Sequence, residues 1–123
     1  MAEILATFTN RFGLLDGKNF SSKQALNKNF NLALNKNERQ DFIENNESIL
    51  KREIGANMLV FMEQIHGDKI AKLKSQSDLM PRTKISHIIK TPCDAIITSL
   101  KGVGICVMVA DCAPIIAMDT KNA

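Results

Sequence analysis

The chain has 123 residues and a mass of 13.6 kDa, which fits one domain with one hydrophobic core. Hydrophobic residues make up 45% and charged residues 24%, a globular composition that excludes wholesale disorder, collagen-like repeats and a long coiled coil. Lys and Arg number 16 and Asp and Glu 13, so the formal charge is +3. That excess is too small for a dedicated nucleic-acid binder, although it is compatible with a phosphate-bearing ligand.

Cysteine usage and the termini place the protein in a cellular compartment. Cys93, Cys106 and Cys112 are odd in number, and their spacings match neither a disulfide framework nor a C-x-x-C motif. The first residues show no signal-peptide pattern. The longest apolar stretch, residues 103–110, is far short of the roughly 20 residues that cross a bilayer. We therefore expect a soluble, reduced, cytoplasmic protein without a membrane partner.

The first predicted elements are a strand and a helix. Residues 5–9 are β-prone and lead into turn signals at 10–13 and 16–17. A helix is expected over about residues 38–54, capped by Asn37 with Gln40 at its third position and stopped by Gly55. One apolar stripe runs along it: Phe42, Ile43, Ile49, Leu50 and Ile54.

Short apolar runs follow the helix at lengths typical of strands. Two of them do not alternate between polar and apolar residues, which predicts strands covered on both faces. A mixed α/β domain with a buried central sheet follows from this order of elements. The runs are residues 58–65, 84–90, 95–98, 103–110 and 115–118, and the last two are those without alternation.

A basic strip extends from Lys69 to Lys90, after the first of these runs and through the second. The strip contains six basic residues and one acidic residue, Asp78. No aromatic residue is interleaved with them, so single-stranded nucleic acid is not an expected partner. The strip could face an anion, but a solvated, lysine-protected sheet edge is the favoured interpretation. Its members are Lys69, Lys72, Lys74, Arg82, Lys84 and Lys90.

His66 and Cys112 each follow a predicted buried strand and precede a turn, where α/β proteins commonly collect site residues. Together they could form a nucleophile and its base, or ligands to zinc or copper. Asp111 puts a carboxylate beside the thiol. On spacing alone a structural role for Cys112 is the stronger alternative. Cys93 and Cys106 are interpreted as structural, and His87 as a satisfied core or interface histidine.

Three motifs resemble those of one family: Q-I-H-G at residues 64–67, C-D-A-I-I-T at 93–98 and V-A-D-C-A-P-I at 109–115. They are similar to the Q-V-H-G, A-D-A-x-x-T and A-D-C-x-P-V/I series of the multicopper polyphenol oxidoreductases, or laccase-domain proteins, also described as purine nucleoside phosphorylases. The family's F-T-x-R-x-G, S-L-N-L and E-N-R motifs resemble residues 8–13, 29–32 and 44–46. The match covers essentially the whole chain in order.

The resemblance implies the N-terminal part of a four-layer α/β sandwich with a buried mixed sheet. By position, His66 and Cys112 match two of the family's three zinc ligands, with copper as the alternative metal. The third is a histidine in a later H-A-G-W-R-G stretch that this chain lacks. Residues 1–123 are therefore expected to be one domain's N-terminal portion, truncated in a hairpin after Met118, although a frayed terminus explains the pattern equally well without the resemblance.

The resemblance also implies substrate contacts. Arg11, Asn31, Asn45 and Asp111 are expected to contact the substrate. Asn46 stands where the family often has arginine, which weakens the expected anion site and leaves Arg11 and the lysine strip as the alternatives that could hold phosphate.

The function that the resemblance implies for the parent protein is phosphorolysis of purine nucleosides (adenosine, inosine, guanosine and methylthioadenosine), with adenosine deamination as a further activity. One alternative is copper-dependent phenol oxidation. The sequence argues against it, because several copper ions need many histidine ligands and the chain has two histidines. Another is cysteine-dependent hydrolysis of a peptidoglycan precursor, with Cys112 as nucleophile and His66 as base. A third is an inactive fragment. With two ligands the chain alone is expected to be catalytically impaired, and to self-associate through an exposed sheet edge.

Overall fold

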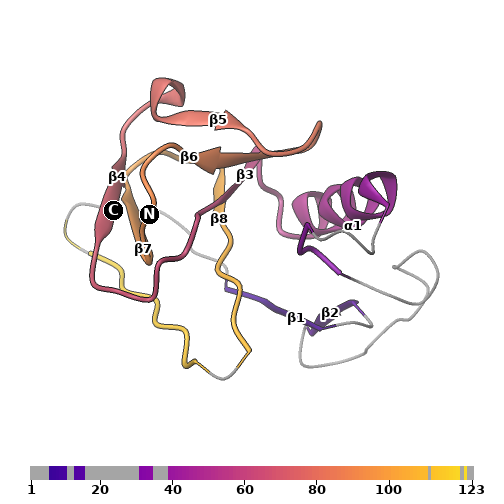
Figure 1. Ribbon diagram of the computed structural model, residues 1–123, viewed down its shortest axis with the longest axis horizontal. Helices are drawn as coiled ribbons and strands as arrows, with labels where there is room; N and C mark the ends of the chain where they lie inside the picture. The colour runs from indigo at the N-terminus through magenta and orange to yellow at the C-terminus, as the bar shows by residue number, and fades with distance from the viewer. Residues whose placement is uncertain are drawn as a thin grey trace.

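The computed structural model describes residues 6–10, 13–15, 31–34, 39–110, 112–119 and 121 (Figure 1). In these residues the chain forms one α-helix, a short 3-10 helix and a series of short strands. The elements are β1 (Phe8–Asn10), β2 (Gly13–Leu15), α1 (Gln40–Glu53), β3 (Met58–Phe61), β4 (Ile70–Leu73), η2 (Gln76–Asp78), β5 (Leu79–Pro81), β6 (Ser86–Ile89), β7 (Ala95–Thr98) and β8 (Val103–Ile105).

The central sheet has four strands in the order β5-β6-β3-β8. β3 runs parallel to both of its neighbours, β6 and β8, while β5 pairs with β6 antiparallel. A parallel pair, β4 and β7, and the antiparallel hairpin of β1 and β2 accompany it. The helix and the mixed sheet confirm the predicted α/β class.

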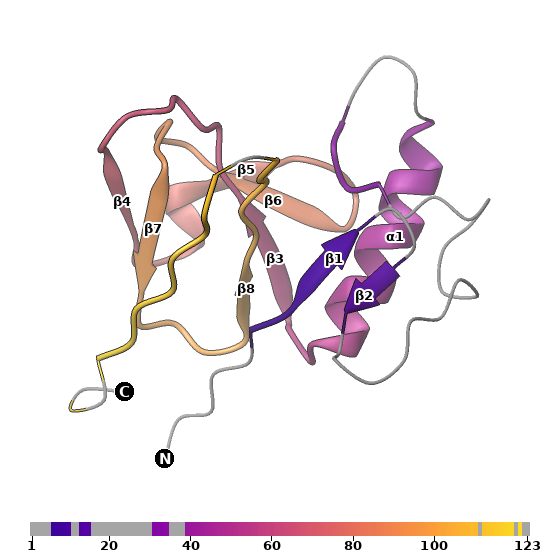
Figure 2. The same ribbon diagram turned by 90° about the horizontal axis from the view of Figure 1, so that it is seen from below.

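Strand β3 separates two hydrophobic clusters because its side chains alternate between the two faces of the sheet. Leu59 and Phe61 pack with the helix residues Ile49 and Leu50. On the opposite face, Val60 and Met62 pack with residues of β4, β5 and β6, namely Ala71, Leu73, Leu79 and Ile89. Figure 2 shows α1 and the β4–β7 pair on opposite sides of β3. Each fully buried aliphatic or aromatic side chain contributes about 1.5–3 kcal/mol to this core.

The predicted helix is confirmed, but its N-terminus differs from the expectation. The N-cap is Arg39, which makes no capping hydrogen bond with its side chain and instead pairs with Asp41 at 2.7 Å. The predicted cap with Gln40 at the third position is therefore wrong, because Gln40 is the first helical residue. Asn37 lies outside the described residues. Among the described residues, no helix is both long and apolar enough to cross a membrane.

The C-terminus of the helix confirms the role predicted for Gly55. This glycine has φ +67°, the left-handed conformation that residues with a Cβ rarely adopt. Its N–H donates to the carbonyl of Arg52 at 3.2 Å, and the N–H of Ala56 donates to the carbonyl of Lys51 at 3.0 Å. This pair of bonds is the Schellman arrangement, which satisfies the last carbonyls of the helix.

Several predicted strands are shorter than their apolar runs. β3 ends at Phe61 and β8 ends at Ile105, and residues 115–118 form no strand. The prediction that 103–110 and 115–118 are covered on both faces is wrong: Ile115 is 90% exposed and Val109 is 45% exposed. An apolar run is buried only where another layer covers it, and no described strand pairs with the chain beyond β8.

The basic strip holds two strands that its composition did not predict, β4 and β5. In β4 the side chains alternate between exposed and buried, so Lys72 faces solvent while Ala71 and Leu73 enter the core. All five lysines of the strip are exposed, as the solvated-edge interpretation predicts. Arg82 is the exception, because its side chain is only 10% exposed.

The turn predicted at residues 10–13 is supported by the β1–β2 hairpin, in which Asn10 pairs with Gly13. The strand itself begins at Phe8, later than predicted. The turn signal at residues 16–17 lies outside the described residues.

Candidate functional site

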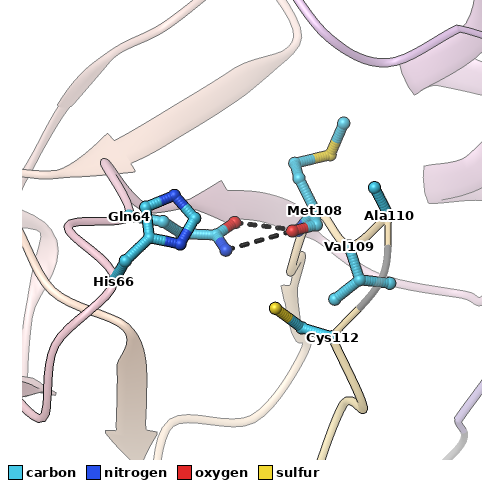
Figure 3. Close-up of a pocket in the computed structure, with 6 residues that line it drawn as sticks. All are labelled: Gln64, His66, Met108, Val109, Ala110 and Cys112. Carbon is cyan, nitrogen blue, oxygen red and sulfur yellow. Dashed lines mark hydrogen bonds between the residues drawn. The ribbon is translucent and has the colours of Figure 1, made fainter.

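His66 and Cys112 line one open cavity of about 370 Å³. Gln64 and three consecutive residues, Met108, Val109 and Ala110, complete the lining. Figure 3 shows the Cys112 sulfur directed toward the side of the cavity where His66 and Gln64 lie. The structure therefore brings together the two residues that the sequence marks as potential nucleophile, base or metal ligand.

The turn that carries His66 is held by the carboxylate of Asp94. His66 has φ +58°, in the left-handed region. Its N–H donates to Oδ1 of Asp94 at 2.9 Å, and the N–H of Gly67 donates to Oδ2 at 2.7 Å. The hydrogen bonds from Gly67 and His66 lower the pKa of Asp94 below its ordinary value, against a smaller opposing effect of desolvation. Sequence analysis assigned Asp94 no role, although it stands in the C-D-A-I-I-T motif directly before β7.

The chain that leads to Cys112 is held by Gln64. Beyond β8, the N–H of Cys106 donates to the carbonyl of Val60 at 2.8 Å. Two residues later, Gln64 Nε2 donates to the carbonyl of Met108 at 3.0 Å and Oε1 accepts from the N–H of Met108 at 3.0 Å (Figure 3). The Gln64 amide thus replaces a backbone neighbour at a place where β3 has already ended.

The three cysteines differ in exposure. Cys112 is exposed, whereas Cys93 is buried and Cys106 is partly buried. Burial raises the pKa of the Cys106 thiol to about 12 and also raises the pKa of Cys93. Cys106 packs against the cluster that contains Leu59 and Phe61. These positions agree with the structural roles predicted for Cys93 and Cys106, and they leave Cys112 as the accessible thiol among the three.

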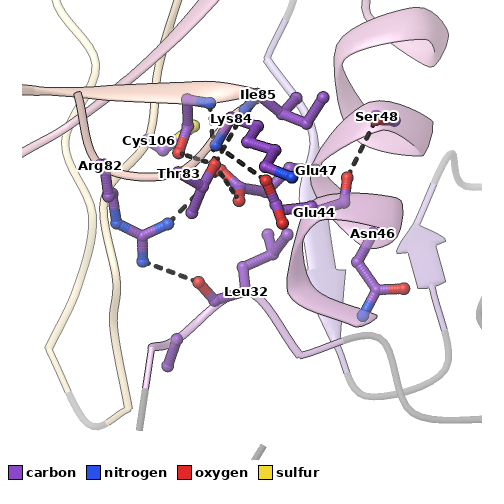
Figure 4. A network of polar contacts seen from close by, with 12 residues as sticks. Leu32, Glu44, Asn46, Glu47, Ser48, Arg82, Thr83, Lys84, Ile85 and Cys106 are labelled. Carbon is purple, nitrogen blue, oxygen red and sulfur yellow. Dashed lines mark hydrogen bonds and ion pairs between the residues drawn. The ribbon is translucent and has the colours of Figure 1, made fainter. Parts of the chain in front are cut away.

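A buried polar network joins α1 to the loop before β6 (Figure 4). Glu47, whose side chain is 0% exposed, accepts from Thr83 Oγ1 at 2.9 Å and lies 3.4 Å from Nη1 of Arg82. Arg82 Nη2 also donates to the carbonyl of Leu32 at 2.8 Å, and its guanidinium lies 3.7 Å from the Phe61 ring centroid. Burial lowers the pKa of Arg82, and Glu47 opposes that shift. The network fixes the helix to the sheet and does not line the cavity.

The residues expected at the substrate are only partly placed. Asn31 Oδ1 accepts from the N–H of Ala33 at 2.9 Å, and its carbonyl accepts from Nδ2 of Asn46 at 2.9 Å. Asn45 lies on α1, and neither it nor Asn31 lines the cavity with His66 and Cys112. Arg11 and Asp111 lie outside the described residues. The buried Asn46 ties the helix to the chain at Asn31.

His87 differs from its prediction. It lies on β6 with a partly buried side chain, as expected of a core histidine, but Nδ1 has no hydrogen-bond partner in the part of the chain that the structure describes. The prediction of a satisfied histidine is therefore wrong at that atom. His87 does not line the cavity of His66.

The donors at the cavity fit part of a metal site. An imidazole nitrogen and a thiolate sulfur are ligands that zinc and copper accept. Within the described ranges, no group of three or more His, Cys, Asp or Glu side chains is arranged to hold a metal ion. His66 and Cys112 therefore fit zinc or copper as two of its ligands.

The fold and this cavity define an α/β protein in which a histidine and a cysteine come together from the segments that follow β3 and β8. The family model described as multi-copper polyphenol oxidoreductase laccase matches residues 6–123, and the chain belongs to that family. The family is associated with metal-dependent enzymatic activity and includes members like purine nucleoside phosphorylases. Comparisons with curated proteins and with solved structures gave no match.

Proposed function

We propose that the protein is a metal-dependent purine nucleoside phosphorylase. The observation that carries the proposal is the shared cavity of His66 and Cys112, which belong to separate segments of the chain. Membership of a family with phosphorylase-like members supports it. The cavity volume of about 370 Å³ is in the range of small-molecule sites.

In this proposal His66 and Cys112 hold a zinc ion as two of its ligands. A bound zinc ion supplies Lewis-acid polarisation of a substrate oxygen or nitrogen. The side chains of Met108, Val109 and Ala110 form an apolar wall against which the flat face of a purine can pack. Arg11 and Asp111, both outside the described residues, are proposed contacts for phosphate and nucleoside.

The reaction exchanges one bond for another. A phosphate oxygen forms a bond to C1′ of the ribose while the bond between C1′ and N9 of the purine breaks. The purine leaves with the bonding electron pair and takes up a proton, and the other product is ribose 1-phosphate. Inosine, adenosine and guanosine all contain this bond, so the proposed substrate class is purine ribonucleosides.

The test measures ribose 1-phosphate released from inosine and adenosine by the zinc-loaded parent protein with inorganic phosphate. His66→Asn and Cys112→Ser should abolish the product, whereas His87→Asn, which changes a histidine away from the cavity, should keep it. Phosphate-dependent product that survives in both His66→Asn and Cys112→Ser, or no product in any zinc-loaded sample, would contradict the proposal.

Copper-dependent phenol oxidation is the second candidate, and the description of the matched family favours it. The same two donors would then hold copper. Metal analysis and an oxygen-uptake assay with a diphenol separate the candidates. Copper-dependent oxygen uptake that is lost in Cys112→Ser would favour oxidation over phosphorolysis.

A further inference from the structure

The backbone of His66 is held in an unfavourable conformation. Among the described residues other than glycine, His66 is the one with positive φ, at +58°. The left-handed conformation is unfavourable for an L-residue, because its Cβ comes too close to a backbone carbonyl oxygen. Such a conformation persists where the surrounding structure determines it, and it is often found at functional sites. The contacts around His66 therefore need a physical explanation.

Two consecutive residues bracket this turn. The N–H of Cys93 donates to the carbonyl of Glu63 at 3.0 Å, before the turn, and the N–H of Asp94 donates to the carbonyl of Lys69 at 3.0 Å, after it. The Asp94 carboxylate, fixed between these two anchors, accepts from the backbone N–H groups of His66 and Gly67. Both oxygens of the carboxylate are thus engaged by the turn that presents His66 to the cavity.

The other wall of the cavity is held separately. Gln64 binds the backbone of Met108, on the segment that continues to Cys112. Among the described residues, the Asp94 carboxylate accepts from the His66 turn and forms no hydrogen bond to that segment. The two walls of the cavity are therefore held by different side chains.

We propose that Asp94 is a positioning residue, which holds the His66 turn in its left-handed conformation and so directs the imidazole toward the metal position beside Cys112. The proposal rests on the metal site of the proposed function. Residues that orient a metal ligand from outside the coordination sphere typically contribute a factor of about 10–100 to metal affinity.

The chain contains a matched control for this carboxylate. Asp78, the last residue of η2, accepts through Oδ2 from the backbone N–H groups of Lys74 and Ser75 at 2.8 and 3.1 Å and does not line the cavity. Asp78→Asn therefore makes the same chemical change at a carboxylate that accepts two backbone N–H groups through one oxygen, away from the cavity. Asp94→Asn keeps the size of the side chain but replaces one of the two acceptor oxygens with an NH2 group, which cannot accept from a backbone N–H.

The experiment measures zinc affinity by competition with a chromophoric chelator, and the thiolate-to-cobalt absorption band of the cobalt-loaded protein. We expect Asp94→Asn to weaken zinc binding about 10–100-fold and to change the cobalt spectrum, with Asp78→Asn within about twofold of the unsubstituted protein. Asp94→Glu, which keeps both acceptor oxygens, should recover part of the affinity. Equal affinity in Asp94→Asn and the unsubstituted protein would overturn the role of Asp94 and leave the proposed function intact.

If neither the unsubstituted protein nor Asp78→Asn binds zinc or cobalt, the proposed function fails. The role of Asp94 is then tested on the metal-free protein. Hydrogen exchange of the His66 and Gly67 amides and the imidazole resonances of His66 are then compared by NMR. Faster exchange of both amides and altered imidazole resonances in Asp94→Asn alone would support positioning of His66. Amides and resonances that match those of Asp78→Asn would overturn it.

Discussion

Gln64 is joined to Met108 through both atoms of its side-chain amide, at 3.0 Å for the bond it donates and 3.0 Å for the bond it accepts. The parallel register of β3 and β8 pairs Val60 with Ile105, and the next bond runs from Cys106 to Val60. The amide therefore continues the pairing of the two segments after the strands themselves have ended. It connects the turn of His66 with the chain that leads to Cys112.

Gln64→Ala should loosen that connection. Two lost hydrogen bonds at a partly exposed site lower the free energy of unfolding by about 1–3 kcal/mol. Zinc affinity should fall by about tenfold or more, because the Cys112 segment is then ordered only on binding. Urea unfolding and zinc competition measure the two effects. Gln76→Ala, at an exposed glutamine of η2, is the control. Equal zinc affinity in the two variants would contradict the role of Gln64 in holding the Cys112 segment.

Glu47→Ala should be among the most damaging changes in the chain. It leaves the guanidinium of Arg82, which is 10% exposed, without its carboxylate partner, at a cost of about 3–5 kcal/mol in the free energy of unfolding. Glu44→Ala is the comparison, since the more exposed Glu44 accepts one backbone bond from Lys84 at 2.8 Å and should cost about 0.5–1.5 kcal/mol. Similar unfolding midpoints for the two variants would show that the Glu47–Arg82 pair is not buried in solution.

The three cysteines should differ in their rates of alkylation. The exposed Cys112 should react with iodoacetamide at pH 8 long before Cys93 and Cys106. The pKa of Cys106 rises from 9.0 to about 12, which lowers its thiolate fraction near pH 8 by about a thousandfold. Peptide mass spectrometry after timed quenching gives the three rates, and comparable rates for Cys106 and Cys112 would refute the burial of Cys106.

The same pKa shift has a consequence for stability at alkaline pH. The unfolded chain loses the Cys106 proton from about pH 9, while the folded protein keeps it up to about pH 12. The unfolded state then binds fewer protons, so the contribution of Cys106 is complete below pH 9 and is lost as the pH rises toward 12. In Cys106→Ala this part of the alkaline loss should be missing from urea unfolding measured across that range.

Two isoleucines test the difference between buried and uncovered apolar runs. Ile43 on α1 is 1% exposed and Ile115 is 90% exposed. Ile43→Ala should lower the free energy of unfolding by about 2–5 kcal/mol, whereas Ile115→Ala should change it by less than about 0.5 kcal/mol. Chemical denaturation of the two variants provides the measurement. A large loss for Ile115→Ala would mean that this segment is packed in solution.

The helix and the strand β7 could be predicted from the sequence because local patterns determine them. The apolar stripe and Gly55 give the helix and its end, and residues 95–98 form a strand with the predicted bounds. The prediction that residues 103–110 and 115–118 form strands covered on both faces was wrong. A hydrophobic run indicates a tendency to be buried but does not show which element covers it. β4 was missed because its alternation of Ile70, Ala71, Lys72 and Leu73 is short and follows a turn.

At the site, the predicted strand ends identified His66 and Cys112. Gln64 and Asp94 stood in motifs of the family resemblance, but nothing in the sequence indicated that they hold the two segments. Gln64 and Asp94 act on backbone groups of residues distant in sequence, and such bonds leave no periodic pattern. The burial of Arg82 was equally hidden, since a basic residue among lysines is expected to be solvated. Its partner Glu47 lies on a helix far away in the sequence.

Strand β3 has hydrogen-bonded neighbours on both edges and apolar clusters on both faces. Its amides should therefore be among the last in the chain to exchange with deuterium, opening only with global unfolding. His66 is connected to this strand by a four-residue stretch. Cys112 follows an exposed stretch that is bonded to β3 through Cys106 and Val60 and, beyond the strand, to Gln64. Binding of a ligand between His66 and Cys112 would thus order the less stable segment of Cys112 against the more stable β3 region. The loss of conformational entropy on binding would therefore come almost entirely from the Cys112 segment.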